Sequence, residues 1–212
     1  DDSQVLSCAV GQQGTIVQTR SYACEGKVWV AGPWLTISNS CHAGSASADL
    51  QLVEFVNSPL QHFFITADPA EANFIDKFLS GIFQRTGLYF YAYLSRAVAP
   101  ITAQPVCRFY ADANVQINSH WYSASAQECL FVLLNWPGIW KLEKADAFFV
   151  QVPDAKGNCP AKTLPVFRFF NNRRDANHRF TVDLSVRRGM QNRAWAPEGY
   201  GPNSVAFCSP IS

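Results

Sequence analysis

Long apolar runs, charge of one sign and recognisable catalytic motifs are all missing from this sequence. No apolar stretch reaches the about 18 residues of a membrane-spanning helix, so we expect no membrane insertion. The net charge is +1 and charged residues form only 16% of the chain, so no general field favours nucleic acid. There is no P-loop, dinucleotide fingerprint, H-E-x-x-H or G-x-S-x-G. These absences argue against an enzyme, and we expect no catalytic residues and no cofactor.

The seven cysteines contain no CxxC pair and no metal-ligand spacing. They are Cys8, Cys24, Cys41, Cys107, Cys129, Cys159 and Cys208. Scattered cysteines of this kind indicate disulfides and an oxidising compartment, so we expect a secreted or cell-surface protein without its signal, or the tail of a longer one. We predict the bonds Cys107–Cys129 and Cys159–Cys208. The three N-terminal cysteines then share one bond, Cys8 or Cys24 with Cys41, and leave one thiol.

One phrase is repeated three times, beginning at Leu52, Val106 and Val166. Each copy has an apolar strand, a polar turn, a histidine followed by a second strand, and a helix led by Ser or Asp. The histidines are 58 residues apart both times: His62, His120 and His178. A fixed period of this size predicts one supersecondary unit copied three times, over about 52–105, 106–165 and 166–212.

Helix and strand signals recur at matching places in each copy. Asp68 and Ser125 are predicted to cap helices within 67–83 and 123–134, and a weaker helix is predicted at 182–191. Each copy closes with an aromatic strand: GLYFYAYL, ADAFFVQV and SVAFCSP. The predicted fold is mainly β (a β-rich α+β class), with three strand-strand-helix-strand repeats in a closed, approximately threefold domain over 50–212.

Residues 1–45 form a separate small β module in this interpretation, too short to enclose much core. The segment resembles the thrombospondin-type-1-like Cys/Trp modules of secreted bacterial proteins. The matching residues are Cys8, Gly11, Gln12, Gly14, Gln18, Arg20, Cys24, Trp29, Trp34 and Cys41. The resemblance implies that arginine stacks on tryptophan in place of a core, although only one arginine is present to do so.

The larger part resembles a bacterial secreted-protein repeat family of unknown function, with the phrase RFYN…HFYT…AE…EG.AFYV. The resemblance rests on VCRFYADANVQINSHWYSASAQEC, ADAFFVQV, VFRFF and WAPEGYGPNSVAFCSP. It implies a C-terminal module on a secreted or surface-anchored protein and supplies no catalytic residues. The first copy departs from the pattern, because Glu54 stands where Arg108 and Arg168 stand.

The histidines and arginines of the repeats have structural and functional interpretations. Three repeated histidines could form a zinc or copper shell, but we favour a structural role in which each imidazole pins its own hairpin. Arg108 and Arg168 lie within aromatic strands, where each could stack on a ring or pair with a buried carboxylate. Glu128 and Glu198 are the candidate carboxylates, and an ion pair between repeats is favoured over a ligand clamp.

Aromatic residues beside Pro, Gly and Asn carry the binding hypothesis, although a core role is the alternative for each. Flat rings stack on sugar faces, while polar groups fix orientation. The predicted ligand-binding residues are Trp121, Trp136, Trp140, Trp195, Tyr200, Arg168 and Asn177. We therefore expect a non-catalytic adhesion or recognition module for a glycan or cell-surface polymer. The alternatives are a structural subunit or cap of an extracellular fibre, with protein subunits as partners, and an accessory domain of a secreted hydrolase.

Overall fold

A computed structural model describes residues 2–7, 12–13, 15–20, 22–25, 28–39, 42–43 and 50–211. Within its N-terminal part, side chains are described for residues 2–4, 18–20 and 31–36. Cys8 and Cys41 lie outside the described residues and the side chain of Cys24 outside the described side chains, so the predicted bond that uses Cys41 stays a prediction. No described helix is both long enough and apolar enough to cross a membrane.

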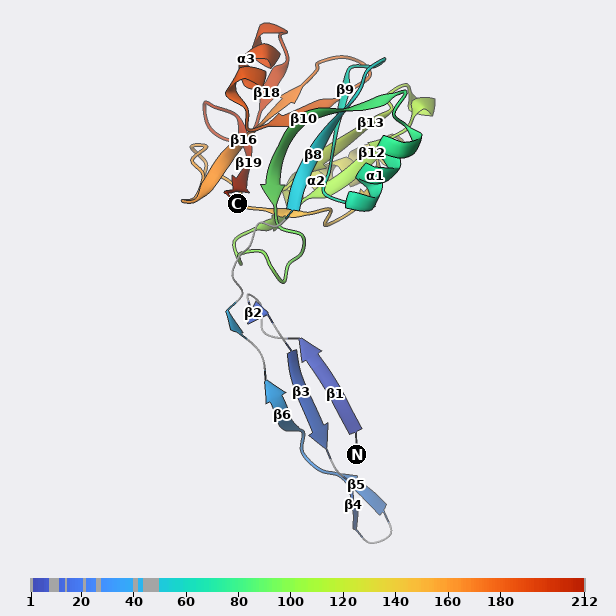
Figure 1. The fold of residues 1–212 in the computed structure, drawn as a ribbon, viewed down its shortest axis with the longest axis vertical. Coiled ribbons are helices and arrows are strands. Elements are labelled where there is room, and N and C mark those ends of the chain that lie inside the picture. Colours follow the sequence, from blue (N-terminus) through green and yellow to red (C-terminus); the bar gives the residue numbers. More distant parts are fainter. Residues whose placement is uncertain are drawn as a thin grey trace.

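The N-terminal part consists of short antiparallel strands (Figure 1). The strands are β1 (Asp2–Ser7), β2 (Gln12–Gln13), β3 (Thr15–Arg20), β4 (Tyr22–Glu25), β5 (Val28–Ala31), β6 (Leu35–Asn39) and β7 (His42–Ala43). β3 lies between β1 and β6, while β4 pairs with β5 and β2 with β7. The guanidinium of Arg20 lies 4.6 Å from the ring centre of Trp34, which is the predicted type of arginine–tryptophan stack. The likeness to a thrombospondin-type-1 module stays a prediction.

Residues 50–211 form three consecutive segments that share an order of elements. The first has β8 (Leu50–Asn57), β9 (His62–Thr66), α1 (Pro69–Phe78) and β10 (Phe83–Ala92), and the short β11 (Gln104–Pro105) follows it. The second has β12 (Cys107–Ala111), a 3-10 turn (Ala113–Val115), β13 (Ser119–Ser123), α2 (Ala126–Asn135), β14 (Lys141–Lys144) and β15 (Phe149–Val150). The third has β16 (Thr163–Phe170), β17 (His178–Thr181), α3 (Leu184–Asn192), β18 (Ala196–Glu198) and β19 (Val205–Pro210). We call these the first, second and third segments.

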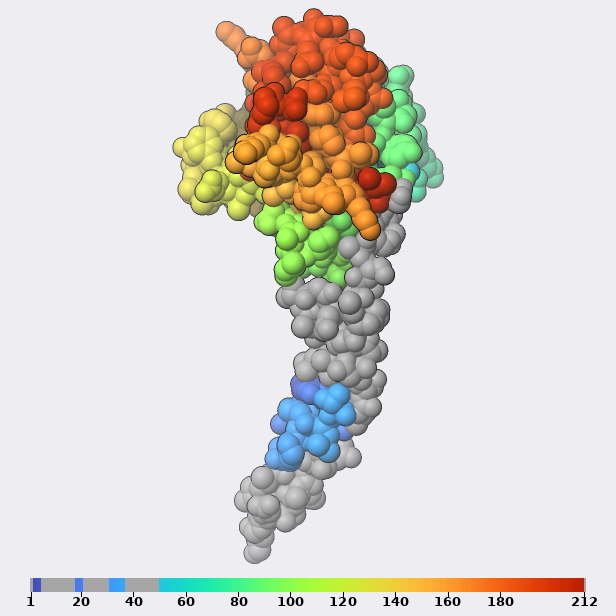
Figure 2. Space-filling model, turned by 90° about the vertical axis from the view of Figure 1, so that its left-hand side faces the viewer, coloured from blue at the N-terminus to red at the C-terminus, as the bar shows by residue number. Residues whose placement is uncertain are grey.

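Each segment builds its own antiparallel sheet, with the first strand in the middle. The sheet orders are β10-β8-β9, β13-β12-β14 and β17-β16-β18, and β19 also pairs with β16. Figure 2 shows the third segment, in orange and red, between parts of the second segment in yellow and of the first in green. The described chain is therefore β-rich, as predicted.

All three predicted helices are present. Asp68 and Ser125 cap the first two, as the sequence indicated, and Asp183 caps the third at the corresponding place. The side chain of Asp68 accepts hydrogen bonds from the amides of Ala70 and Glu71, and Pro69 occupies the first turn. Ser125 and Asp183 cap α2 and α3 in the same way. These bonds satisfy amides that a helix start leaves without a partner.

The sheet register corrects the alignment of the three histidines. The pairs are Phe55 with Phe64, Phe109 with Trp121 and Phe169 with Arg179. His120 and His178 each precede this partner by one residue, whereas His62 precedes it by two. His62 therefore occupies the place of Ser119 and Asn177. The equal 58-residue spacing of the histidines suggested equivalent positions, but the turn at 58–61 is shorter than those at 112–118 and 171–177, so the strand positions differ.

The two disulfides in the larger part pair as predicted. Cys107–Cys129 joins the central strand β12 to helix α2, across 6.3 Å between the Cα atoms. Cys159–Cys208 ties the entry of the third segment to β19, across 5.6 Å. Two such bonds fit an oxidising compartment.

One hydrophobic core is shared by the three segments. It includes Phe55 from the first, Tyr122 from the second, and Phe180 and Phe207 from the third. The rings of Phe180 and Phe207 stack 5.1 Å apart, and the buried hydroxyl of Tyr122 donates to the carbonyl of Ile65 at 2.6 Å. Each sheet buries one face against the other two. We call the contact between two segments a seam, and the polar side chains buried at a seam must find partners there.

Candidate functional site

The seam between the second and third segments is held by Arg168, on the central strand of the third sheet. Its two terminal nitrogens donate to both oxygens of Glu128, on α2, at 3.0 and 3.2 Å. Its Nε lies 3.0 Å from Glu198 on the adjacent strand β18, although the angle there falls short of a hydrogen bond. Both carboxylates that the sequence suggested for this arginine are therefore its partners, and the pair to Glu128 joins two segments.

Arg108 makes the same arrangement at the seam between the first and second segments, but not with Glu128 or Glu198, so the carboxylates that the sequence suggested are wrong for this arginine. It donates to Glu71 on α1 at 2.8 and 3.1 Å, and its Nε lies 2.8 Å from Glu143 on β14. His120 and His178 complete the two arrangements, because their Nε2 atoms lie 3.3 and 3.2 Å from Glu143 and Glu198.

The seam between the third and first segments reverses the direction of the pair. Glu54 takes the place of the arginine on the central strand, and Arg179 on β17 donates to it at 2.9 and 2.8 Å. Both side chains are buried. The guanidinium also lies 3.8 Å from the ring centre of Phe63. The departure of Glu54 from the repeat pattern is thus matched by a change at Arg179 in another segment.

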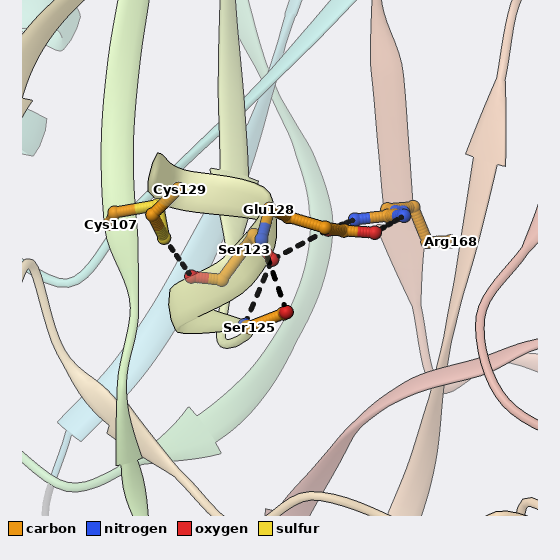
Figure 3. The surroundings of a disulfide bond; sticks show 6 residues. All are labelled: Cys107, Ser123, Ser125, Glu128, Cys129 and Arg168. Carbon is orange, nitrogen blue, oxygen red and sulfur yellow. Dashed lines mark hydrogen bonds and ion pairs between the residues drawn. A yellow bond between two sulfur atoms is a disulfide. The ribbon is translucent and has the colours of Figure 1, made fainter. Parts of the chain in front are cut away.

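Local contacts fix the position of Glu128 (Figure 3). The Ser125 hydroxyl accepts from the Glu128 amide at 3.2 Å, and the Ser123 hydroxyl donates to its carboxylate at 2.7 Å. The disulfide follows immediately, at Cys129, and anchors the same turn of α2 to β12. The carboxylate therefore meets Arg168 from a turn held by a covalent bond, a cap and a serine.

Beside this ion pair lies a cleft of about 670 Å³ between the second and third segments. Its walls come from α2 and the following loop on one side and from β16 to β18 on the other. They include Ile117, Trp121, Gln127, Glu128, Phe131, Val132, Trp136, Ile139, Trp140, Arg168, Phe170, Ala176, His178 and Glu198. Four of the seven predicted ligand-binding residues meet here: the three tryptophans of the second segment and Arg168.

The cleft has aromatic walls and a charged end. Trp136 and Phe131 are 43% and 52% exposed, and their rings meet edge to face with centres 5.2 Å apart. Trp121 and Trp140 form the buried backing, because each is only 9% exposed. An exposed, braced aromatic pair next to polar groups can stack on an apolar face of a ligand while the polar groups bond its edge.

A second cavity of about 290 Å³ adjoins the first, since Gln127, Glu128 and Arg168 line both. Its other walls include Ser123, Ser125 and the predicted residue Tyr200. The backbone there requires Gly199, whose φ is +141° and whose added Cβ would lie 2.7 Å from the carbonyl carbon of Ser204.

The cavities beside the buried pairs of the other two seams are small. The cavity beside Arg108 measures about 10 Å³, and the one beside Glu54 about 20 Å³. Lys144 lines the cavity beside Arg108, on the strand that pairs with that arginine. The large cleft is therefore at the seam lined by the three tryptophans of the second segment.

The titratable groups of the cleft favour one charge state. Burial opposes ionisation of Glu128, but Arg168 outweighs it and lowers the pKa of the carboxyl. Burial also opposes ionisation of Glu198, and His178 and Arg168 together lower its pKa. The pKa of His178 is lowered by burial, against the opposite effect of Glu198. At neutral pH the two carboxylates and one guanidinium leave one net negative charge in the cleft.

The remaining predicted residues lie elsewhere. Trp195 packs edge to face on Phe63, with ring centres 6.0 Å apart, and does not line the cleft. Asn177 is fully buried, and its amide group bonds the backbone of Phe63 and the hydroxyl of Ser119. It joins all three segments in the interior, so we do not carry it into the site.

The three histidines do not gather around one ion. His62 bonds the Asn118 carbonyl through Nδ1 at 3.0 Å, and its Nε2 lies 3.1 Å from Asp175. The other two pair with separate glutamates, as described above. Among the described residues no three His, Cys, Asp or Glu side chains are placed to hold a metal ion. These placements therefore do not support the weak alternative of a three-histidine metal shell.

Several cleft residues could not be recognised in the sequence. Phe131 and Ile139 gave no signal that separates them from core residues of a helix and its exit. His178 was noticed only as part of a triplet, although its pairing with Glu198 places it in the wall. The KLEK and APE strands, which carry Glu143 and Glu198, are short and polar and were not predicted as strands.

A family model matches residues 11–151, and its description is a domain of unknown function, DUF5648. The chain belongs to the DUF5648 family. No curated protein and no solved structure matches the chain. The DUF5648 match includes the tryptophan wall of the cleft but ends before Arg168, Phe170 and His178. The cleft of this DUF5648 protein is thus completed by residues beyond the matched range.

Proposed function

We propose that this chain is a non-catalytic extracellular recognition module that binds a glycan or surface polymer in the cleft between its second and third segments. The observation that carries the proposal is the meeting of Trp121, Trp136 and Trp140 with the ion pair of Arg168 in one open cavity. Protein sites for cyclic, partly apolar ligands combine such aromatic walls with a few convergent polar groups.

An extended ligand fits this site better than a single small molecule. The two adjoining cavities share the Glu128–Arg168 pair as a common wall, so a chain of sugars could contact the aromatic side and then the serine and Tyr200 side. Binding at this seam also differs from several equivalent weak sites, since the cavities beside Arg108 and Glu54 at the corresponding places are far too small for a sugar ring.

The charge states in the cleft support a binding role over hydrolysis. A glycosidase needs one carboxyl that keeps its proton near neutral pH, together with a second that is ionised. Here the pKa values of Glu128 and Glu198 are both lowered, and both groups are paired with Arg168. We retain a role as accessory domain of a secreted hydrolase as an alternative for the full-length protein.

We also infer that the three segments are sequence repeats closed into a ring of approximate threefold symmetry. Ion pairs join the first segment to the second, the second to the third, and the third to the first. The matching positions His62, Ser119 and Asn177 are all buried, and Asn177 bonds both other segments. Together these contacts support a closed arrangement with these three residues near its axis.

A glycan array with the purified chain tests the proposed function. We expect binding to a restricted set of glycans, lost in Trp136→Ala and unchanged by a chelator. Phe78→Ala is the matched control, because Phe78 is an exposed aromatic on α1, outside the cleft. Equal binding by the wild type and Trp136→Ala would place the interaction elsewhere, and no binding to any glycan would reject the proposal.

A structural role in a fibre has one observation in its favour. Helix α2 exposes Leu130, Leu133 and Leu134, which are 55%, 39% and 70% exposed. An apolar helix face of this kind often marks a contact with another protein. Concentration-dependent association in sedimentation, abolished by Leu134→Lys and without any glycan binding, would favour this alternative.

A further inference from the structure

The cleft combines aromatic walls with an excess of negative charge, and this combination selects among glycans. Glu128 and Glu198 approach Arg168 from two sides, and their side chains remain 44% and 32% exposed. One guanidinium cannot neutralise two carboxylates. No lysine and no second arginine lines the cavity.

Both carboxylates retain capacity to accept hydrogen bonds. Each carboxylate has about four lone-pair sites. Glu128 uses part of them for the two Arg168 nitrogens and the Ser123 hydroxyl. The ion pairs of Glu198 within the described residues are to the Arg168 Nε at 3.0 Å and the His178 Nε2 at 3.2 Å. The exposed oxygens at this end can therefore receive N–H donors from a ligand.

His178 adds no positive charge at neutral pH. Its imidazole is buried against Phe170, with ring centres 5.0 Å apart, and burial lowers its pKa. Its Nδ1 also has no hydrogen-bond partner within the described residues. The charged end of the cleft thus keeps its single negative charge under physiological conditions.

We propose that the cleft recognises amino sugars in their cationic form, with the sugar ring on Trp136 and Phe131 and the ammonium group at Glu128 and Glu198. The inference rests on the proposed glycan-binding function and names its ligand class. A cation next to tryptophan faces gains from the ring quadrupoles as well as from the carboxylates. An acidic sugar at the same place would meet like charge.

Matched β-1,4 tetrasaccharides test the proposal by isothermal titration calorimetry. The glucosamine tetramer carries an ammonium where cellotetraose carries a hydroxyl, and the N-acetylglucosamine tetramer carries a neutral amide. With the amine protonated and at low salt, we expect the glucosamine tetramer to bind about tenfold more tightly than cellotetraose, in line with one partly exposed charge contact. Raising the salt should reduce this ratio, because exposed charge pairs are screened.

Two variants locate the effect. Glu198→Gln should bring the ratio close to one, while Glu143→Gln should leave it unchanged. Glu143 is the matched control, because it holds the corresponding place beside Arg108 at a closed seam. Circular dichroism and thermal melting check that both variants fold, and the salt series on the unmodified chain needs no variant.

The outcomes separate this proposal from the one on which it rests. Equal binding of the three tetrasaccharides overturns the preference for amino sugars and leaves glycan recognition intact. Tighter binding of tetralysine than of the glucosamine tetramer overturns the assignment to a sugar, because it shows that the ammonium alone suffices. Binding to no tetrasaccharide and to no glycan on the array rejects both.

Discussion

The reversed ion pair between Glu54 and Arg179 gives the sharpest test of how the three segments are joined. Glu54 is 3% exposed and accepts two hydrogen bonds from Arg179. Removing one partner of such a buried pair leaves the other as an unpaired buried charge and costs about 3–5 kcal/mol of stability. Because glutamine retains some hydrogen bonding, we expect Glu54→Gln to lower the free energy of unfolding by about 3 kcal/mol, the lower end of that range.

The size of the domain translates this loss into a measurable melting shift. A loss of about 3 kcal/mol corresponds to a decrease in Tm of about 6–12 °C for a domain of this length. Replacing both residues by methionine should recover most of the loss, since a well-packed apolar pair can replace a buried ion pair at little cost. The coupling is then obtained from a double-mutant cycle.

Equilibrium unfolding in urea, followed by tryptophan fluorescence without reductant, measures these differences. Asp76→Asn is the control, because it breaks the Asp76–Arg85 pair, in which both side chains are more than 40% exposed. We expect no resolvable change in its midpoint. The reasoning would be refuted if Glu54→Gln unfolded at the wild-type midpoint. It would also be refuted if the double methionine variant were less stable than both Glu54→Met and Arg179→Met.

Two other perturbations test the support of the cleft and its charge. Replacing Cys107 and Cys129 by alanine should lower the free energy of unfolding by about 3 kcal/mol, given their 22-residue separation. It should also weaken glycan binding, because the disulfide holds the turn that carries Glu128. Unchanged stability and binding would exclude this support. Between pH 7 and 4 we expect stability to fall, because the lowered pKa values of His178, Glu198 and Glu128 let the unfolded chain bind more protons. The His178 part of this loss begins near pH 6.5, its unperturbed value, and urea unfolding of His178→Phe should lack it.

Local chemistry made part of this structure predictable. Asp68 and Ser125 could be identified as caps because the side chain that satisfies the first amides is encoded within four residues. The pairing Cys107–Cys129 followed from the place of both cysteines within one repeat, and Cys159–Cys208 followed because Cys159 precedes the third repeat and Cys208 ends it. Glu128 and Glu198 could be named for Arg168 because a buried guanidinium needs a carboxylate, but the same suggestion is wrong for Arg108, which pairs with Glu71 and Glu143.

The rest depended on register and on long-range packing. The histidine alignment was off by one because two hairpins of different loop length gave the same spacing, and only the strand pairing reveals the slip. Trp121 and Trp195 look alike in sequence, yet one lines the cleft and the other packs on Phe63. β14 and β18 were missed because they are short, polar strands held by their central neighbour rather than by their own pattern.

The reversed pair also has a consequence for how many segments the chain can join. Helices α1 and α2 each offer a glutamate three residues after the cap, whereas α3 has Val186 at that place. The third segment therefore has no acceptor for the arginine of a following copy, and the first, with Glu54, has no arginine to offer a preceding one. In the proposed closed arrangement, Glu54 and Arg179 thus pair the first segment with the third, and their charges disfavour a pairing of either segment with a further copy.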